Sequence, residues 1–192
     1  MIYVAFLRGV NVGGKGIISM AAIKEALVVI GLSDVRTYIN SGNVIFSTRA
    51  SDVQRLTAGI EKALEQHTGM AIKVLVMDHK TLKKMVDKIP RNWVDDKTMR
   101  TYVLLLSKEL DDRRILDRLP IKPGVDELRY TPGAVVWRVD RENVGRSHMN
   151  RIVGTPLYKK ITIRSANTMR KLNELTATPT RSSDRPKSAT TI

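Results

Sequence analysis

The order of secondary structure in the first 78 residues limits the folds open to this chain more than any other feature. Residues 2–7 form an apolar run typical of a buried strand. Apolar side chains at helical spacing follow behind Ser19, a candidate N-cap, and end at Gly31. The chain therefore begins with a strand, a glycine-rich connection and an amphipathic helix.

A hairpin and a second helix follow. Residues 35–39 and 44–47 are rich in β-forming residues, and Asn40-Ser41-Gly42-Asn43 between them suits a tight turn. Ser51 is a candidate cap for the second helix, and residues 72–77 form another strand-like run. The first 78 residues thus read β-α-β-β-α-β.

The same order recurs after a connecting segment, residues 79–98, in which Pro90 ends a short helix. In the second half the pattern predicts a strand, a helix, a hairpin, a helix, a short strand and a last helix, at residues 99–106, 110–119, 128–139, 147–153, 160–163 and 169–175.

Two β-α-β-β-α-β units predict an α+β fold of two ferredoxin-like units in tandem, each an antiparallel sheet with helices on one face. The expected boundaries are 1–78 for the first unit, 79–98 for a helical connector and 99–175 for the second unit. Residues 176–192 are polar and basic with almost no apolar side chains, so we expect a disordered tail there.

Charge and composition limit the classes of binding partner that we expect. The net charge is +14, and most of the excess lies beyond residue 78, so an anionic small molecule or nucleic acid becomes a plausible partner. A solvated basic surface explains the same charge. There is no cysteine, and no apolar run is long enough to span a membrane, so we expect a cytoplasmic protein without a membrane partner. The oligomeric state stays open.

The glycine-rich connection, residues 8–16, is the first candidate site. Backbone N–H groups of such a loop can turn toward a phosphate, with Arg8 and Lys15 as cationic partners. Its spacing matches neither the nucleotide-hydrolysing P-loop nor the dinucleotide fingerprint. The competing interpretation is structural, with glycines for shape and Asn11 for an internal turn hydrogen bond.

For two other motifs as well, a ligand-binding role and a purely structural role both remain open. The hairpin turn with Ser41 and Asn43 reads most simply as a turn, and we expect it at the end of the sheet opposite the glycine-rich loop. The stretch from Arg164 to Lys171 opens the last helix. It can bind an anion at the helix start, or Ser165 can be no more than an N-cap.

These segments resemble one bacterial family, the domain of unknown function 1697. The similarity is dense over residues 7–15 and 34–46, and a second block is similar to residues 162–168, where Ser165 and Ala166 depart from the Asn and Trp of the family. The resemblance covers roughly residues 1–175. It implies a two-unit ferredoxin-like fold and supplies no activity.

The sequence therefore favours a protein that binds a phosphorylated small molecule or nucleic acid. It leaves open an enzyme acting on a phosphorylated or nucleotide-like substrate in the cleft between the units, and an interaction domain whose loops hold the two units together. The histidines, His67, His79 and His148, lack metal-ligand spacing, and no cofactor is expected. If a reaction occurs, Arg8, Lys15, Ser41 and His148 are its candidate participants. The candidate ligand-binding residues are Arg8, Asn11, Gly13, Gly14, Lys15, Ser41, Asn43, Arg164, Asn167, Thr168 and Lys171.

Overall fold

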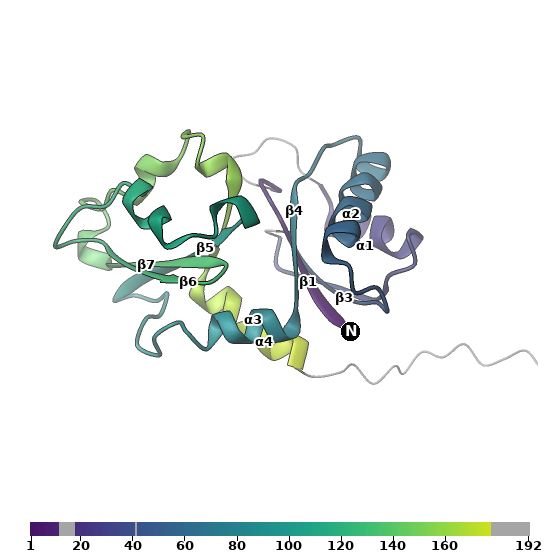
Figure 1. Ribbon diagram of the computed structural model, residues 1–192, viewed down its shortest axis with the longest axis horizontal. Helices are drawn as coiled ribbons and strands as arrows, with labels where there is room; N and C mark the ends of the chain where they lie inside the picture. Colours follow the sequence, from purple (N-terminus) through teal and green to yellow (C-terminus); the bar gives the residue numbers. More distant parts are fainter. Residues whose placement is uncertain (12–17, 41, 178–192) are drawn as a thin grey trace, which may run out of the picture.

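The computed structural model describes residues 1–11, 18–40 and 42–177 and shows a mixed α+β fold with two four-stranded antiparallel sheets. The candidate residues Gly13, Gly14, Lys15 and Ser41, and residues 178–192 of the expected tail, lie outside the described residues. Figure 1 shows the two sheets side by side, with two helices beneath them.

The first sheet has the strand order β2-β3-β1-β4. Its strands are β1 (Ile2–Leu7), β2 (Ser33–Tyr38), β3 (Asn43–Ser47) and β4 (Val74–Asp78), and its helices are α1 (Met20–Val29) and α2 (Val53–Thr68). Ser19 caps α1 as predicted, because its side chain accepts a hydrogen bond from the Ala22 N–H. The cap of α2 is Asp52 and not Ser51, since the Asp52 carboxylate accepts from the Arg55 N–H.

The second sheet repeats the arrangement, in the order β6-β7-β5-β8. Its strands are β5 (Met99–Leu106), β6 (Glu127–Thr131), β7 (Ala134–Asp140) and β8 (Ile161–Ser165), and α4 (Ala166–Ala177) follows. Helix α4 includes Thr176, which is buried, so the expected tail begins two residues too early. The helices predicted at 110–119 and 147–153 are 3₁₀ segments, Lys108–Leu110, Arg113–Arg118 and Met149–Ile152, with further ones at Arg141–Asn143 and Tyr158–Lys160.

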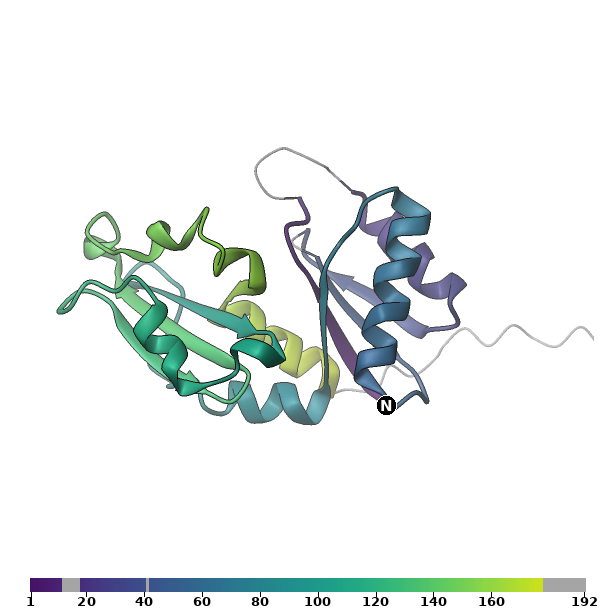
Figure 2. The same cartoon turned by 45° about the horizontal axis from the view of Figure 1, so that its top comes forward.

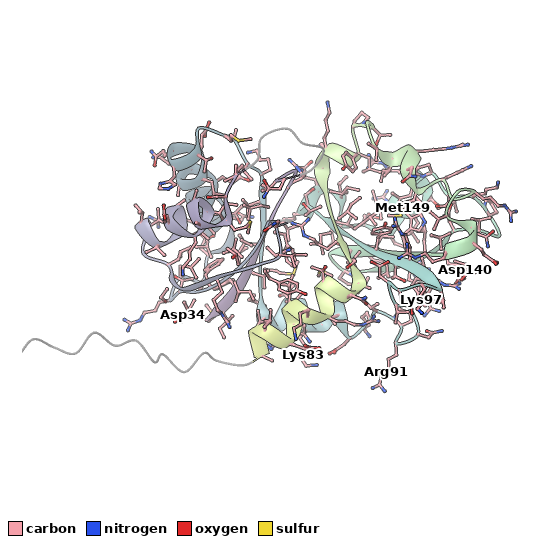
Figure 3. The ribbon with its side chains drawn as sticks, turned by 180° about the vertical axis from the view of Figure 1, so that it is seen from behind. Asp34, Lys83, Arg91, Lys97, Asp140 and Met149 are labelled. Carbon is pink, nitrogen blue, oxygen red and sulfur yellow. The ribbon has the colours of Figure 1, made fainter. Side chains whose placement is uncertain are left out.

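Helix α3 (His79–Val86) lies in the connector and contacts α4, and together they form a layer shared by both sheets. Figure 2 shows this pair beneath the sheets, and α4 crosses the lower part of the view in Figure 3. Side chains from both sheets and both helices form one core: Val4, Phe6, Ile45, Val103, Leu105, Val136, Leu82, Met85, Met169 and Leu172.

Both sheets are consequently covered on two faces, so the expectation of helices on one face is wrong. In the first sheet Tyr3 and Ala5 face α1 and α2, whereas Val4 and Phe6 face α3 and α4. Burial of both rows explains why β1 is apolar throughout. In the second sheet the 3₁₀ segments cover the face that includes Trp137.

A buried carboxylate, Asp126, holds the loops around Trp137. Its Oδ1 accepts from Ser147 Oγ at 2.5 Å and Trp137 Nε1 at 3.1 Å, and its Oδ2 accepts from the N–H groups of Lys122 at 2.8 Å and His148 at 3.0 Å. Burial by itself would raise the pKa of Asp126, but these four hydrogen bonds outweigh it and the pKa lies below its ordinary value. Among the described residues, no helix has the length and apolarity needed to cross a membrane.

Candidate functional site

The described start of the glycine-rich loop, residues 8–11, lies at the same end of the first sheet as the start of β3, contrary to the expectation from the sequence. Strand β1 runs antiparallel to β3 with Phe6 opposite Asn43, so the start of β3 lies beside the end of β1. The Leu7 N–H donates to the Gly42 carbonyl at 2.8 Å. The two motifs can therefore contribute to one site.

Asn11 joins these two segments. Its Oδ1 accepts from the Ile18 N–H at 2.9 Å, and its Nδ2 donates to the carbonyls of Ile18 and Asn40, each at 3.0 Å. Asn11 has a φ of 55°, a left-handed conformation that asparagine tolerates. The structural interpretation of Asn11, an internal turn hydrogen bond, is confirmed by these contacts.

Arg164 of β8 reaches across from the second sheet to the same end of the first. Its Nε donates to Asn43 Oδ1 at 2.6 Å, and its Nη1 donates to the Ile163 carbonyl at 2.8 Å. Its Nη2 donates to the carbonyls of Leu7 at 2.7 Å and Gly42 at 3.1 Å. Arg164 thus ties the end of β1 and the hairpin turn to β8.

The charge of Arg164 is buried without a carboxylate partner in the part of the chain that the structure describes. The residue is 9% exposed, and its guanidinium lies 5.8 Å from the centre of the Phe6 ring. Burial lowers the pKa of Arg164 to about 10, so the side chain stays protonated at neutral pH. Carbonyl dipoles and the ring face balance this charge only partly.

A pocket of about 440 Å³ opens at this junction, and we call it the arginine pocket. Arg8 and Gly9 contribute from the end of β1, and the other lining residues come from the segment before β8 and from β8 itself: Tyr158, Lys159, Ile161, Thr162, Ile163 and Arg164. Three of these side chains are cationic and none is acidic. Such a wall attracts an anion.

Arg8 is a half-buried cation of this wall, intermediate in exposure between the exposed Lys159 and the buried Arg164. Its side chain is half-buried and makes no hydrogen bond or ion pair with residues 1–11, 18–40 or 42–177. Its backbone is fixed, because the Arg8 N–H donates to the Lys73 carbonyl at 2.9 Å. The structure thus holds the base of Arg8 in place and leaves its guanidinium available to a ligand.

A larger cleft of about 640 Å³ lies between β4 and the second sheet, and we call it the inter-sheet cleft. It shares Arg8 and Thr162 with the arginine pocket. Its wall is mostly aliphatic, with these apolar residues: Val53, Ala58, Val74, Leu75, Val76, Met77, Met85 and Leu106. The two cavities therefore meet at Arg8 and differ in polarity.

The other predicted residues of the α4 start lie away from both cavities. Asn167 Nδ2 donates to the Asp95 carbonyl at 2.7 Å, and Lys171 pairs with Glu174 at 2.9 Å. The Thr168 N–H donates to Ser165 Oγ at 3.1 Å, so Ser165 acts as the N-cap of α4. Of this stretch, Arg164 alone lines the arginine pocket.

Asn43, another predicted ligand-binding residue, has a structural role instead. It is fully buried, and its amide lies between Arg164 and the Tyr38 carbonyl, to which Nδ2 donates at 3.1 Å. From the sequence, Lys159 counts only toward the basic charge of the second half, and Tyr158 is not identified as a candidate site residue. Their contribution depends on the pairing of β8 with β5, which no local pattern shows.

The three histidines do not form a cluster. His67 Nε2 lies 3.4 Å from a Glu25 carboxylate oxygen, and His79 Nδ1 lies 2.9 Å from Thr176 Oγ1. His148 stands in the loops around Asp126. Within the described ranges there is no group of three or more side chains suited to hold a metal ion.

Comparisons with known proteins place the chain in a family without giving it an activity. No curated protein matches the sequence. The conserved bacterial protein SP0830 from Streptococcus pneumoniae has a similar structure, with 26% sequence identity and a TM-score of 0.78 over 91% of this chain and 98% of that chain. Residues 1–137 match a family described as "Protein of unknown function (DUF1697)". The match confirms the resemblance carried by the glycine-rich loop and the hairpin, and the chain belongs to the DUF1697 family.

Proposed function

We propose that this protein binds an anionic small molecule in the arginine pocket. The observation that carries this proposal is the convergence of Arg8, Lys159 and Arg164 on one pocket without an acidic side chain in its lining. A buried guanidinium with no carboxylate partner raises the affinity of the site for a phosphate or carboxylate group. Gly9 lies beside these cations in the pocket lining, and no other atom of the described residues lies within 4 Å of the position that a Cβ would take there, so a ligand can approach its backbone.

A small molecule fits this site better than nucleic acid does. Sheets that bind single-stranded RNA expose aromatic side chains for base stacking. Here Tyr3, Phe6, Phe46 and Trp137 are at most 1% exposed, because both faces of each sheet are covered. The remaining contribution to nucleic-acid binding would come from surface charge and from half-buried rings such as Tyr158 of the arginine pocket.

Binding is proposed ahead of catalysis for a chemical reason. The described lining of the arginine pocket contains no histidine or carboxylate, the groups that most often perform general acid–base catalysis. The alternative, an enzyme acting on a phosphorylated or nucleotide-like substrate in the cleft between the units, requires turnover of a bound phosphate compound. Phosphorus NMR of such mixtures over hours would detect it.

We further propose that each sheet with its connections is a ferredoxin-like unit, over residues 1–78 and 99–175, joined by 79–98. The support is the strand order, which is the same in the two sheets when strands are counted within each half. The cysteine-free composition is compatible with a reducing compartment such as the cytoplasm.

Calorimetry and thermal shift with phosphate-containing ligands test the anion site. We expect Arg8→Ala to weaken binding by about 10- to 100-fold, because a charge-assisted hydrogen bond is lost. Arg91→Ala is the matched control, since Arg91 is exposed and points away from the molecule in Figure 3. Equal responses of the two variants, or a wild type that no anion stabilises at low salt, would contradict the proposal.

A further inference from the structure

We infer that the ligand is a phosphate ester with an aliphatic body, its phosphate in the arginine pocket and its body in the inter-sheet cleft. This inference rests on the proposed anion site and adds the chemical class of the molecule. The two cavities meet at Arg8 and Thr162, so one ligand can occupy both.

The charge around the two cavities is uneven. In the inter-sheet cleft, Lys73 pairs with Glu61 at 2.7 Å and Lys160 pairs with Glu109 at 3.0 Å, while Lys108 is exposed at the rim. In the arginine pocket, Arg8, Lys159 and Arg164 have no acidic partner among the residues that the structure describes, whereas Lys108 is the unpaired lysine of the cleft. The attraction for an anion is therefore greatest at the end of the joined cavity that holds the arginine pocket.

One further donor is available at that end. A guanidinium carries five N–H groups, and the contacts of Arg164 use four of them, one at Nε, one at Nη1 and two at Nη2. The second N–H of Nη1 has no acceptor within the described ranges. An oxygen of a bound phosphate can accept this hydrogen bond together with those from Arg8.

The opposite end of the cavity offers apolar surface. Strand β4 is the edge of its sheet, so both of its side-chain rows border the cleft, Val74 and Val76 on one and Leu75 and Met77 on the other. Among the described lining residues of this cleft there is no aromatic ring. The wall therefore suits an alkyl chain better than a nucleotide base, which gains most from stacking.

The cleft is kept open by the way the two edge strands satisfy their backbone groups. The Val74 N–H of β4 donates to Glu61 Oε1 at 2.9 Å, and the Ile163 carbonyl of β8 accepts from Arg164 Nη1 at 2.8 Å. Side chains thus occupy positions at which another strand would pair. The two sheets do not join edge to edge, and space for a ligand remains between them.

A series of phosphates measured by calorimetry tests this inference: inorganic phosphate, butyl phosphate, hexyl phosphate, AMP and the uncharged hexyl glucoside. We expect affinity to rise with chain length, by up to about fourfold for each methylene buried. Hexyl phosphate should bind at least tenfold more tightly than inorganic phosphate. Hexyl glucoside should bind weakly, and Arg8→Ala should weaken every phosphate in the series.

Ala58→Trp tests the contribution of the aliphatic body separately from that of the phosphate. Ala58 lies on α2 at the wall of the inter-sheet cleft and outside the arginine pocket. The substitution should abolish the chain-length gain and leave inorganic phosphate unchanged. Ala21→Trp is the control, since Ala21 is exposed on α1 and outside both cavities.

The outcomes distinguish the two proposals. Equal affinities for inorganic and hexyl phosphate would overturn the aliphatic body and leave the anion site standing. Tighter binding of AMP than of hexyl phosphate would replace the aliphatic body with an aromatic one. If no phosphate binds, or hexyl glucoside binds as tightly as hexyl phosphate, the anion site itself is wrong.

Discussion

Asp126 and Arg164 show how single buried charges organise this molecule by opposite means. Asp126 accepts four hydrogen bonds from β7 and the loops of the second sheet, whereas Arg164 donates three across the junction between the sheets and a fourth within β8. Neither forms an ion pair with a described residue. Each therefore fixes its partners through directional bonds that a different side chain cannot reproduce.

The hydrogen bonds of Asp126 predict that the free energy of unfolding falls at acid pH. Its pKa is lower in the folded than in the unfolded state, so the unfolded chain takes up the proton first as the pH falls. The stabilisation is complete above pH about 4 and is lost as the pH drops through the lowered pKa. We expect Asp126→Asn to cost about 2–4 kcal/mol at pH 7 and to flatten this acid-side decline, in urea unfolding measured from pH 2 to 7.

Asp117→Asn serves as the control, because Asp117 is exposed and makes no hydrogen bond within the described residues. Its stability profile should match the wild type within about 0.5 kcal/mol. A similar loss in both variants would show that Asp126 has no special role.

At the scale of elements, the β2-β3 hairpin depends on Gly42. Gly42 has a φ of +73°, and a Cβ placed there would lie 2.8 Å from the Leu7 Cβ, on β1. Gly42→Ala should therefore push the turn away from β1 and lower stability by about 2–4 kcal/mol. Chemical unfolding of the purified variant measures this loss.

Gly31→Ala isolates the effect of crowding. Gly31 has a similar φ of +81°, but a Cβ there meets no atom within 4 Å. Its cost should be limited to about 1 kcal/mol of backbone strain. If Gly42→Ala is no worse than Gly31→Ala, the close approach to β1 does not matter for stability.

The elements themselves were predictable to different degrees. The pattern behind Ser19 gives α1 correctly because capping and apolar spacing are local. The helix expected at 110–119 is broken by tertiary contacts, since the Asp111 carboxylate accepts from Tyr130 Oη at 2.8 Å and the Gly133 N–H at 2.6 Å. Those partners belong to a hairpin further along the chain, so no local pattern could show them.

The candidate site was predictable only in pieces. Arg8 and Arg164 were both visible in the sequence, but their meeting depends on the pairing of β1 with β3 and on the placement of β8 beside the first sheet. The order of elements alone does not show that β1 ends where β3 begins, so it predicts the wrong end of the sheet for the hairpin. Asn167 and Lys171 are near Arg164 in sequence, but on α4 they contact Asp95 and Glu174 and not the pocket.

At the scale of the whole molecule, α3 and α4 pack in one core with residues of both sheets. Leu172 of α4 is fully buried in the core shared by both sheets. We expect the wild type to unfold in a single thermal transition, and Leu172→Ala to lower its stability by about 2–5 kcal/mol. Hydrogen exchange should show amides of β1 and β5 losing protection by similar factors.

Val29→Ala is the matched control, because Val29 is an apolar residue of α1 that is 79% exposed. It should leave the transition within about 0.5 kcal/mol of the wild type. Two separate transitions in the wild type, or faster exchange in β5 with β1 unchanged, would show that the sheets fold independently.

The position of α4 after every described strand also bears on synthesis at the ribosome. All four strands of the first sheet have emerged by Asp78, but the helix that covers the face with Val4 and Phe6 follows about 100 residues later. Helix α3 follows β4 directly, so at roughly 5–20 residues per second the part of that apolar face that α4 covers stays exposed in the nascent chain for roughly 5–20 seconds. During this interval it is a binding site for a chaperone, and synonymous codons that slow translation between β4 and α4 would lengthen the exposure.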